Sequence, residues 1–293
     1  MACESRKWQR WRKVNFLKAA IVYAGKITTV SEKYAEEIQT KQMGCGLNGV
    51  LKERSIDITG ILNGVDYTIW SPSRDKKIPC RYHRANLSGK RTDKIELLGY
   101  ASLPVREKTP LIGMISRLTD QKGFDLLVEA ASDIFELNLQ MIILGTGEEK
   151  YHQLLKKLEN CYPDKLKVFL TFDDELAHKI EAASDIFLMP SRFEPCGLNQ
   201  MYSLKYGTIP IIHKVGGLSD TVVDINLKTN EGTGFVFEEY TVKALLETIN
   251  KAVTLYSKRR LWTKIMKIAM QQDFSWSKSA KKYVQLFKQL IYG

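Results

Sequence analysis

The sequence has no long apolar run, few cysteines and no regular spacing of metal ligands. The apolar run nearest the start, residues 16–24, is interrupted by Lys18 and is shorter than the ~20 residues that a membrane-spanning helix needs. The five cysteines are odd in number and form no Cys-x-x-Cys or Cys/His pattern, which argues against a disulfide framework and a zinc site. We therefore expect no signal peptide, no membrane partner and a reducing location, the cytoplasm or a plastid.

Internal repeats and low-complexity tracts are also lacking, and the basic residues do not alternate with aromatic ones. The net charge of +11 comes from basic residues spread over segments 6–18, 76–94, 150–167 and 258–267. Runs such as Lys258-Arg-Arg are typical of solvated helix faces, so we expect no nucleic-acid partner. A phosphate-bearing small ligand and an anionic surface both remain compatible with the charge.

The chain from Pro110 onward alternates short β-rich runs with amphipathic stretches, in a composition of 44% hydrophobic and 26% charged residues that is ordinary for a folded protein. This alternation predicts an α/β fold, a Rossmann-like doubly wound parallel sheet. The predicted strands are 111–115, 140–144, 167–170, 186–189, 209–212 and 234–237. The predicted helices are 124–137, 150–158, 174–183, 199–206, 219–224, 242–256, 261–271 and 277–291.

The segment before this alternation is less regular. It predicts a helix over 14–23, a strand over 26–30, a helix from the cap Ser31 to 38, and a short strand over 58–62 that ends in the turn Asn63-Gly64. Glycines at 44, 46 and 49 indicate a loop, and the charged stretch 72–90 indicates a surface loop.

Two blocks follow predicted strands and carry residues suited to a polar ligand. Residues 190–202 place Glu194 at a tight turn before a helix whose free N–H groups favour a phosphate or sugar oxygen. Residues 116–125 place Arg117 and Lys122 on one loop, where both can converge on an anion. Each residue has a plainer reading, because Glu194 could only cap the helix and the two cations could be surface charges.

Two further blocks put glycines after strands, Leu144-Gly-Thr-Gly-Glu and Val215-Gly-Gly-Leu-Ser-Asp. The first makes Gly145 a candidate ligand contact, although a simple turn explains it equally well. Because parallel strands end at one edge of a sheet, we expect all four loops to lie together.

The residues of these blocks and their order along the chain closely resemble the bacterial glycogen synthase and plant starch synthase family, from about Val14 to the C-terminus. The matching strings are Lys26-Ile-Thr-Thr-Val-Ser, Ile61-Leu-Asn-Gly-Val-Asp-Tyr-Thr-Ile-Trp-Ser-Pro, Asn86-Leu-Ser-Gly-Lys, Ile115-Ser-Arg-Leu-Thr-Asp-Gln-Lys-Gly, Leu176-Ala-His-Lys-Ile, Met189-Pro-Ser-Arg-Phe-Glu-Pro-Cys-Gly-Leu-Asn-Gln, Tyr206-Gly-Thr-Ile-Pro, Gly216-Gly-Leu-Ser-Asp-Thr-Val and Asp273-Phe-Ser-Trp.

The resemblance implies the C-terminal half of a GT-B fold, in which two Rossmann-like domains face a cleft. It implies glucose transfer from ADP-glucose, less often UDP-glucose, to the non-reducing end of an α-1,4-glucan with retention of configuration. No cofactor or metal is implied, and no Asp-x-Asp pair is present. Arg117 and Lys122 would bind the diphosphate and stabilise the departing nucleotide, and Glu194 would lie beside the donor glucose.

The resemblance also implies further contacts to the donor. Cys196 and Gly197 would give close backbone contacts, Leu198 and Asn199 would lie against the nucleotide, and Phe172 would stack on the adenine where relatives carry Tyr. Asn63 is a weaker candidate for a sugar contact.

Two departures from the family pattern qualify this assignment. Tyr202 stands where the wider superfamily often has a second Glu, and the family's N-terminal phosphate loop and acceptor-side His have no counterpart here. We therefore expect residues 1–59 to be a remnant of the N-terminal domain, residues 60–275 to be the nucleotide-sugar domain and residues 276–293 to be a C-terminal helix. Whether residues 1–12 are native stays open. The four histidines, at 83, 152, 178 and 213, are expected to be structural or solvent-facing.

Such a chain alone should bind donor weakly and turn over little, because it cannot build a closed cleft. Its apolar positions Phe16, Leu17, Ile21 and Val22 should need cover from a separate first domain or self-association. The alternative is a truncated, non-catalytic module that binds nucleotide sugar or glucan. Another GT-B transferase is a third reading, against which the strings at 195–197 and 273–276 argue.

Overall fold

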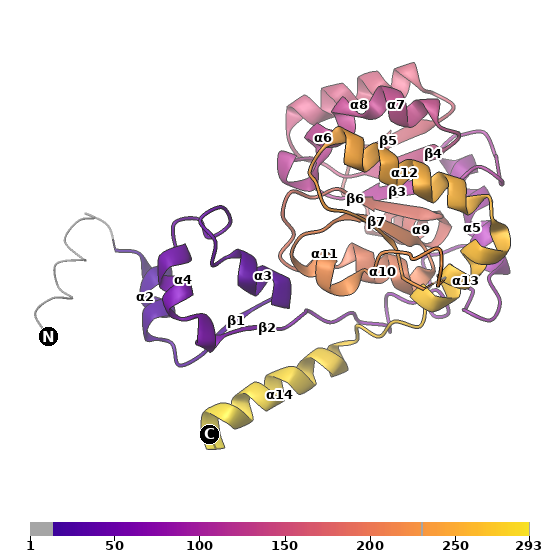
Figure 1. The fold of residues 1–293 in the computed structure, drawn as a ribbon. Coiled ribbons are helices and arrows are strands. Elements are labelled where there is room, and N and C mark those ends of the chain that lie inside the picture. Colours follow the sequence, from indigo (N-terminus) through magenta and orange to yellow (C-terminus); the bar gives the residue numbers. More distant parts are fainter. Residues whose placement is uncertain (1–13, 230, 293) are drawn as a thin grey trace, which may run out of the picture.

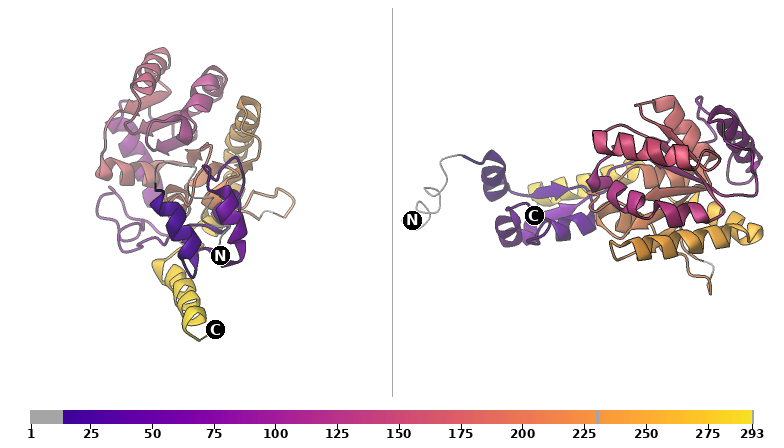
Figure 2. Two further views of the ribbon diagram at one scale, coloured as in Figure 1. Left: turned by 90° about the vertical axis from the view of Figure 1, so that its left-hand side faces the viewer. Right: turned by 90° about the horizontal axis from the view of Figure 1, so that it is seen from above.

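The computed structural model describes residues 14–229 and 231–292, so the question about residues 1–12 falls outside the described part. A larger lobe is built around one twisted sheet, and a smaller lobe lies beside it (Figure 1). Viewed from above, the smaller lobe projects from one end of the larger one, and the C-terminal helix α14 (Trp276–Tyr292) runs back along the same side (Figure 2).

The larger lobe contains six parallel strands in the order β5-β4-β3-β6-β7-β8. This is the 3-2-1-4-5-6 order of the Rossmann fold, so the predicted doubly wound parallel sheet is confirmed. The strand order reverses between β3 and β6, where Ile112 pairs with Ile186. The strands are β3 (Leu111–Ile115), β4 (Gln140–Leu144), β5 (Leu166–Phe169), β6 (Ile186–Met189), β7 (Ile209–His213) and β8 (Phe235–Phe237).

Helices cover both faces of this sheet, which explains why its strands are almost continuously apolar. On β3, Ile112 and Met114 belong to the core beneath α6, α7, α8 and α12, whereas Leu111 belongs to the core beneath α5 and α9. The helices are α5 (Ser88–Tyr100), α6 (Phe124–Glu129), α7 (Ala131–Glu136), α8 (Glu149–Cys161), α9 (Asp174–Ala183), α10 (Asn199–Tyr206), α11 (Gly216–Thr221), α12 (Val242–Tyr256) and α13 (Arg259–Ala269).

Two helix predictions were wrong in detail. The helix expected over 124–137 is two helices that meet at Ala130. The helix expected over 219–224 begins at Gly216 and ends at Thr221. Helix α5 was missed because several of its buried positions, among them Lys90, Asp93 and Lys94, are charged and hide the apolar periodicity.

The smaller lobe is held together by Arg54, which follows the unpredicted helix α4 (Asn48–Glu53). Its guanidinium donates to the carbonyl oxygens of Ile21, Val22 and Ala24 and forms an ion pair with Asp57. This lobe also contains α2 (Phe16–Tyr23), β1 (Ile27–Thr29), α3 (Glu32–Glu37), η1 (Ser55–Asp57) and β2 (Ile58–Gly60), with β1 and β2 parallel.

The apolar residues of α2 divide between inside and outside. Phe16 is 82% exposed and Leu17 is exposed too, as expected, but the expectation was wrong for Ile21, which is only 8% exposed. Val22 is partly buried. None of the helices in the described ranges has the length and apolarity needed to cross a bilayer.

The two lobes meet through polar contacts. Near this junction, the turn at residues 63–64 packs against Trp276. Ser31 Oγ, which caps α3, donates to the carbonyl oxygen of Pro195 at 2.6 Å. The turn Asn63-Gly64 packs on Trp276, since a Cβ on Gly64 would lie 2.3 Å from the Trp276 Cα. Two strings of the family pattern, 61–72 and 273–276, therefore lie side by side, and the loop at Pro195 touches the smaller lobe.

Candidate active site

Two adjoining cavities open at the carboxyl ends of β3, β4, β5 and β6. One has a volume of about 220 Å³ and the other about 300 Å³. Both are lined by Ile115, Ser116, Arg117 and Asn199, so they form two compartments of one site. This is the edge of the sheet, beside the reversal of strand order, where open α/β folds bind ligands.

The smaller compartment, which we call the acidic compartment, contains the residues of the first two predicted blocks. Lys122 Nζ lies 2.5 Å from Glu194 Oε2, and Ser191 Oγ donates to the same oxygen at 3.2 Å. Glu194 is 7% exposed, so its carboxylate is held by one cation and one hydroxyl in a nearly closed setting. Glu194 is thus not the cap of α10, whose N-cap residue is Leu198, and Lys122 is not a solvated surface charge.

Backbone geometry brings the two loops this close. Gly123 has a φ of +80°, and a Cβ there would lie 2.1 Å from the Pro190 carbonyl oxygen. The Arg192 N–H donates to the Gln121 carbonyl oxygen at 2.9 Å and ties the loops together. A side chain at position 123 would push Lys122 away from Glu194.

Arg117 stands at the rim shared by both compartments. Its side chain is exposed, and within the described part of the chain its guanidinium has neither an ion pair nor a hydrogen bond. A guanidinium without a partner at the mouth of two cavities is suited to bidentate binding of phosphate oxygens.

The loop from Glu194 to Leu198 closes the acidic compartment. The Gly217 N–H donates to the Glu194 carbonyl oxygen at 3.0 Å, and a Cβ at Gly217 would lie 2.2 Å from the Cys196 carbonyl oxygen. The glycines of the fourth block thus allow α11 to pack against this loop. Burial raises the pKa of the Cys196 thiol to about 11, so it is a neutral side chain near pH 7.

Gly197 and Leu198 line the acidic compartment, at the start of α10. The first N–H groups of a helix lack partners within the helix, so the start of α10 is suited to an anion. Asn199 Nδ2 donates to the Ile115 carbonyl oxygen at 2.8 Å and so fixes the start of α10 to the end of β3.

The larger compartment, which we call the aromatic compartment, holds Phe172 and Gly145. Phe172 follows β5 and is 88% exposed, so its ring is available to a ligand. Gly145 has a packing reason of its own, since a Cβ there would lie 1.9 Å from the Ser116 carbonyl oxygen. Its lining of the cavity is compatible with a ligand contact as well.

Trp70 also lines this compartment and was not singled out from the sequence. Its ring is stacked between His178, at a centroid distance of 3.6 Å, and Tyr202, at 4.0 Å. Trp70 lies within the recognised string 61–72, so the sequence marked this residue but not its stacking contacts. Tyr202, which stands where other enzymes have a second Glu, therefore supports the wall of the site.

Asn63 lies away from the two compartments. It lines a separate cavity of about 250 Å³ with Asp220, Phe274 and Lys278. The backbone N–H of Asn63 nevertheless reaches the Cys196 thiol. Asn63 therefore touches the loop from Glu194 to Leu198 through its backbone.

The histidines take structural places. His178 is buried, and its Nδ1 lies 2.7 Å from a carboxylate oxygen of Asp75. His213 is buried between the carbonyl oxygens of Ser191 and Glu238. Neither these two nor His83 and His152 line the compartments. Across residues 14–229 and 231–292, no group of three or more His, Cys, Asp or Glu side chains is arranged to hold a metal ion.

Comparison with known families gives two matches. Residues 100–267 match the family model described as glycosyl transferases group 1, which covers more than half of the chain. Residues 2–53 match the model described as starch synthase catalytic domain.

Similar proteins are glycogen synthases and a starch synthase. The chain is 47% identical to the glycogen synthase of Koribacter versatilis over 96% of its own length, and 48% identical to that of Kosmotoga olearia over 97%. It spans 58% and 61% of those two relatives. The catalytic domain of starch synthase IV from Arabidopsis thaliana, solved with ADP and acarbose, superposes with a TM-score of 0.89 at 36% identity, covering 94% of this chain and 58% of that one.

More distant structures share the fold alone. Sucrose-phosphate synthase from Thermosynechococcus elongatus is 20% identical with a TM-score of 0.64, over 94% of this chain and 60% of that one. The resemblance expected from the sequence is confirmed by these matches taken together.

Proposed function

This chain belongs to the group 1 glycosyl transferases, and on that premise we propose that it is the donor-binding half of a retaining glucosyltransferase that extends an α-1,4-glucan from ADP-glucose. The observation that carries the proposal is the convergence of Arg117, Lys122 and Glu194 on one edge of the sheet. A diphosphate and a sugar need cations and a carboxylate side by side, and this edge offers both.

The diphosphate would occupy the rim between the compartments. Arg117 would donate hydrogen bonds to the diphosphate oxygens from the open side. Lys122 would contact both a phosphate oxygen and the carboxylate of Glu194. As the bond between glucose and the diphosphate breaks, negative charge grows on the leaving ADP, and fixed cations stabilise it. We propose that these two side chains and the N–H groups at the start of α10 supply this stabilisation without a metal ion or other cofactor.

The glucose would lie in the acidic compartment, against Glu194 and the backbone of Cys196 and Gly197. The compartment has a volume of about 220 Å³, which suits one sugar ring. Positive charge develops on the sugar during glycosyl transfer, and a buried carboxylate beside it lowers the energy of that state.

The base would lie in the aromatic compartment, with Phe172 as its stacking platform. The Arabidopsis relative was solved with ADP, which makes adenine our choice of base. The glucan acceptor is part of the proposal through the glycogen synthases that the chain resembles.

The donor site as described is open on the side of Arg117 and Phe172. Because transfer to a sugar instead of water needs a closed cleft, we propose that residues 1–293 by themselves bind the donor but transfer glucose slowly. Glucose incorporation into glycogen at a rate typical of enzymes, about 10 per second, would contradict this statement.

Isothermal titration calorimetry with ADP, UDP and ADP-glucose tests the proposal. We expect ADP and ADP-glucose to bind, and Arg117→Ala to weaken both by about 1.5–3 kcal/mol, the value of a hydrogen bond to a charged group. The matched control is Arg106→Ala, which removes an exposed arginine that pairs with Asp164 outside both compartments. Absence of binding, or an equal loss in the control, would overturn the proposal. Binding of ADP-glucose with no transfer, even when the remaining part of the relatives' length is supplied as a separate domain, would favour a non-catalytic module.

A further inference from the structure

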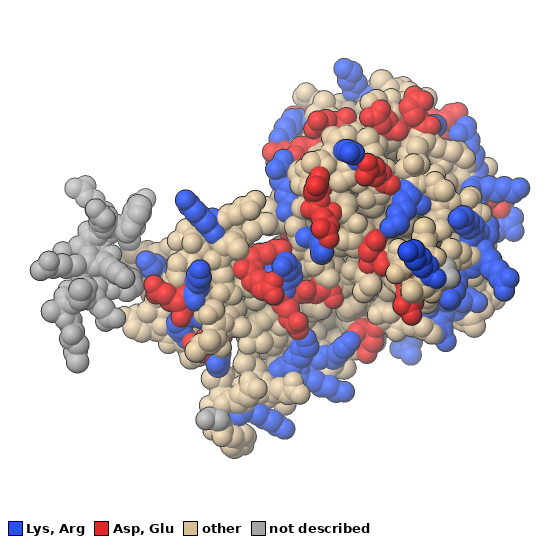
Figure 3. Space-filling view, in the orientation of Figure 1, with Lys and Arg blue, Asp and Glu red and all other residues tan. Residues whose placement is uncertain are grey.

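A large groove lined by basic side chains lies apart from the donor site. Its volume is about 1230 Å³, several times that of either compartment. It is lined by residues of α13 and by the loop at Arg84, and Lys and Arg side chains gather over this end of the larger lobe (Figure 3). Six cations line this basic groove, namely Arg84, Lys258, Arg259, Arg260, Lys264 and Lys267.

Five of the six cations of the basic groove have no side-chain hydrogen bond or ion pair within the described residues. Other surface cations do form ion pairs, for example Lys150 with Asp120 and Lys251 with Asp224. In the groove, only Arg259 has partners among the described residues, the carbonyl oxygens of Glu107 and Lys108 and the ring of Tyr256. No acidic side chain of the described part lines the groove.

The local helix makes the accumulation of positive charge stronger. Helix α13 begins after Lys258 with no side-chain cap, and its first turn carries Arg259 and Arg260 with no acidic residue. The N-terminus of a helix already bears a partial positive charge, so basic residues there are the unfavourable choice for stability. A bound anion would offset the repulsion between these basic side chains and the positive end of the helix.

The spacing of the cations forms a line. Arg260, Lys264 and Lys267 stand four and three residues apart, so they share one face of α13 and follow one another by about 6 Å and about 4.5 Å along its axis. Arg84, from a separate segment of the chain, lines the same groove. Such a line fits a chain of closely spaced negative charges better than a single anion.

The lining also indicates which polyanion fits. No aromatic side chain lines the groove, and its apolar floor is Leu261, Ile268 and Ala85. Single-stranded nucleic acids are held by stacking of bases on aromatic rings, and no ring is offered here. We propose that the basic groove binds inorganic polyphosphate, a linear anion with neither bases nor sugars to stack. This site is independent of the donor site and of the function proposed for it.

The test compares the wild-type chain with two triple variants of equal net charge. The groove variant is Arg260→Gln/Lys264→Gln/Lys267→Gln, and the control variant is Lys52→Gln/Lys156→Gln/Lys157→Gln, on the exposed faces of α4 and α8. Short-chain polyphosphate and orthophosphate are titrated by calorimetry at several salt concentrations. A single variant, Arg84→Gln, checks the separate segment.

We expect polyphosphate to bind the wild type and the control alike, at least about tenfold more weakly to the groove variant, and more weakly to Arg84→Gln as well. The slope of log affinity against log salt is negative, and its magnitude should decrease by about 2 when three phosphate contacts are lost. This follows from a value of about 0.7 per contact for single-stranded polyanions. ADP binding should be unchanged in all variants, which shows that they are folded. An equal loss in groove and control variants, no binding of polyphosphate to the wild type, or tighter binding of a single-stranded RNA than of polyphosphate would each overturn the proposal.

Discussion

Lys122 Nζ lies 2.5 Å from Glu194 Oε2 although 72 residues separate the two in the chain. The contact joins the loop after β3 to the loop after β6, the two strands between which the sheet reverses its order. In the proposed donor complex, an arriving phosphate would compete with Glu194 for the ammonium group of Lys122. The proposal therefore couples donor binding and glucose transfer through this one contact.

Glu194→Gln should separate these two roles. The amide keeps the shape but releases Lys122 from its ion pair, so ADP should bind as tightly as to the wild type or more tightly. Transfer should fall at least about 100-fold, as for loss of a group that stabilises the transition state. Calorimetry with ADP on this chain measures the binding. An assay of glucose incorporation measures the transfer, with the remaining part of the relatives' length supplied as a separate domain. Weakening of ADP binding by more than about tenfold would show that Glu194 only shapes the pocket.

Phe172 should matter through its ring alone. Phe172→Ala should weaken ADP binding by about 1–3 kcal/mol, the value of stacking a base on an aromatic side chain, and Phe172→Tyr should leave it near the wild-type value. Phe287→Ala, which removes another exposed ring on α14, is the matched control. Equal affinities for Phe172→Ala and the wild type would remove the ring from the donor site.

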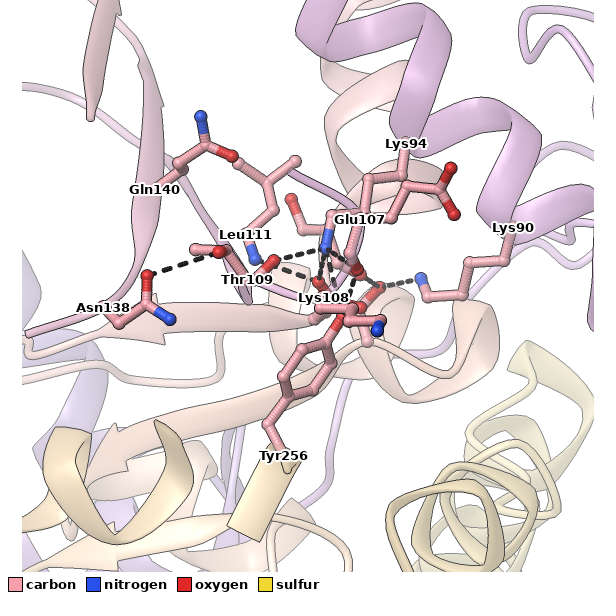
Figure 4. Close-up of polar contacts among 12 residues, drawn as sticks. Lys90, Lys94, Glu107, Lys108, Thr109, Leu111, Asn138, Gln140 and Tyr256 are labelled. Atoms are coloured by element: carbon pink, nitrogen blue, oxygen red, sulfur yellow. Dashed lines mark hydrogen bonds and ion pairs between the residues drawn. The ribbon is translucent and has the colours of Figure 1, made fainter. Parts of the chain in front are cut away.

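Lys94 should contribute strongly to the stability of the fold, although it does not line the donor site. Its ammonium group contacts the carbonyl oxygen of Thr109 at 2.6 Å, the hydroxyl of Tyr256 at 3.1 Å and the carboxylate of Asp185 at 2.6 Å, and so ties α5 to the amino ends of the strands (Figure 4). Lys94→Met should lower the free energy of unfolding by about 3–5 kcal/mol, because it leaves Asp185 buried without its cation.

Urea unfolding followed by circular dichroism measures this loss. Adding Asp185→Asn to Lys94→Met should recover part of it, since the unpaired charge is then gone. A loss below about 1 kcal/mol in the single variant would mean that this network contributes little.

Glu181 should make stability fall as the pH rises. Burial raises the pKa of its carboxyl group from 4.5 to about 8, and Ser203 is its one hydrogen-bond partner among the described residues. Between these two values the folded chain keeps a proton that the unfolded chain loses, so the contribution of Glu181 to stability declines through this window. Relative to the wild type, Glu181→Gln should therefore gain free energy of unfolding from pH 5 to pH 8. A difference between the two proteins that does not change over this range would contradict the assignment.

The sheet could be predicted from the sequence because its strands are buried on both faces and read as apolar runs, as at residues 111–115 and 140–144. The sequence also predicted that three site residues lie close together, because the loops after parallel strands lie at one edge of the sheet. These residues are Arg117, Lys122 and Glu194. Helix α5 could not, because Lys90, Asp93 and Lys94 are buried through partners that lie far away in the chain. The stack of His178, Trp70 and Tyr202 was equally hidden, since three separate segments build it.

The most direct test of the donor site compares ADP with adenosine on the double variant Arg117→Ala/Lys122→Ala. If these two cations hold the diphosphate, ADP affinity should fall by at least about 100-fold, two charged hydrogen bonds of about 1.5 kcal/mol each, while adenosine affinity stays within about twofold of the wild type. ADP affinity that is unchanged, or adenosine affinity that falls as far as that of ADP, would contradict the account.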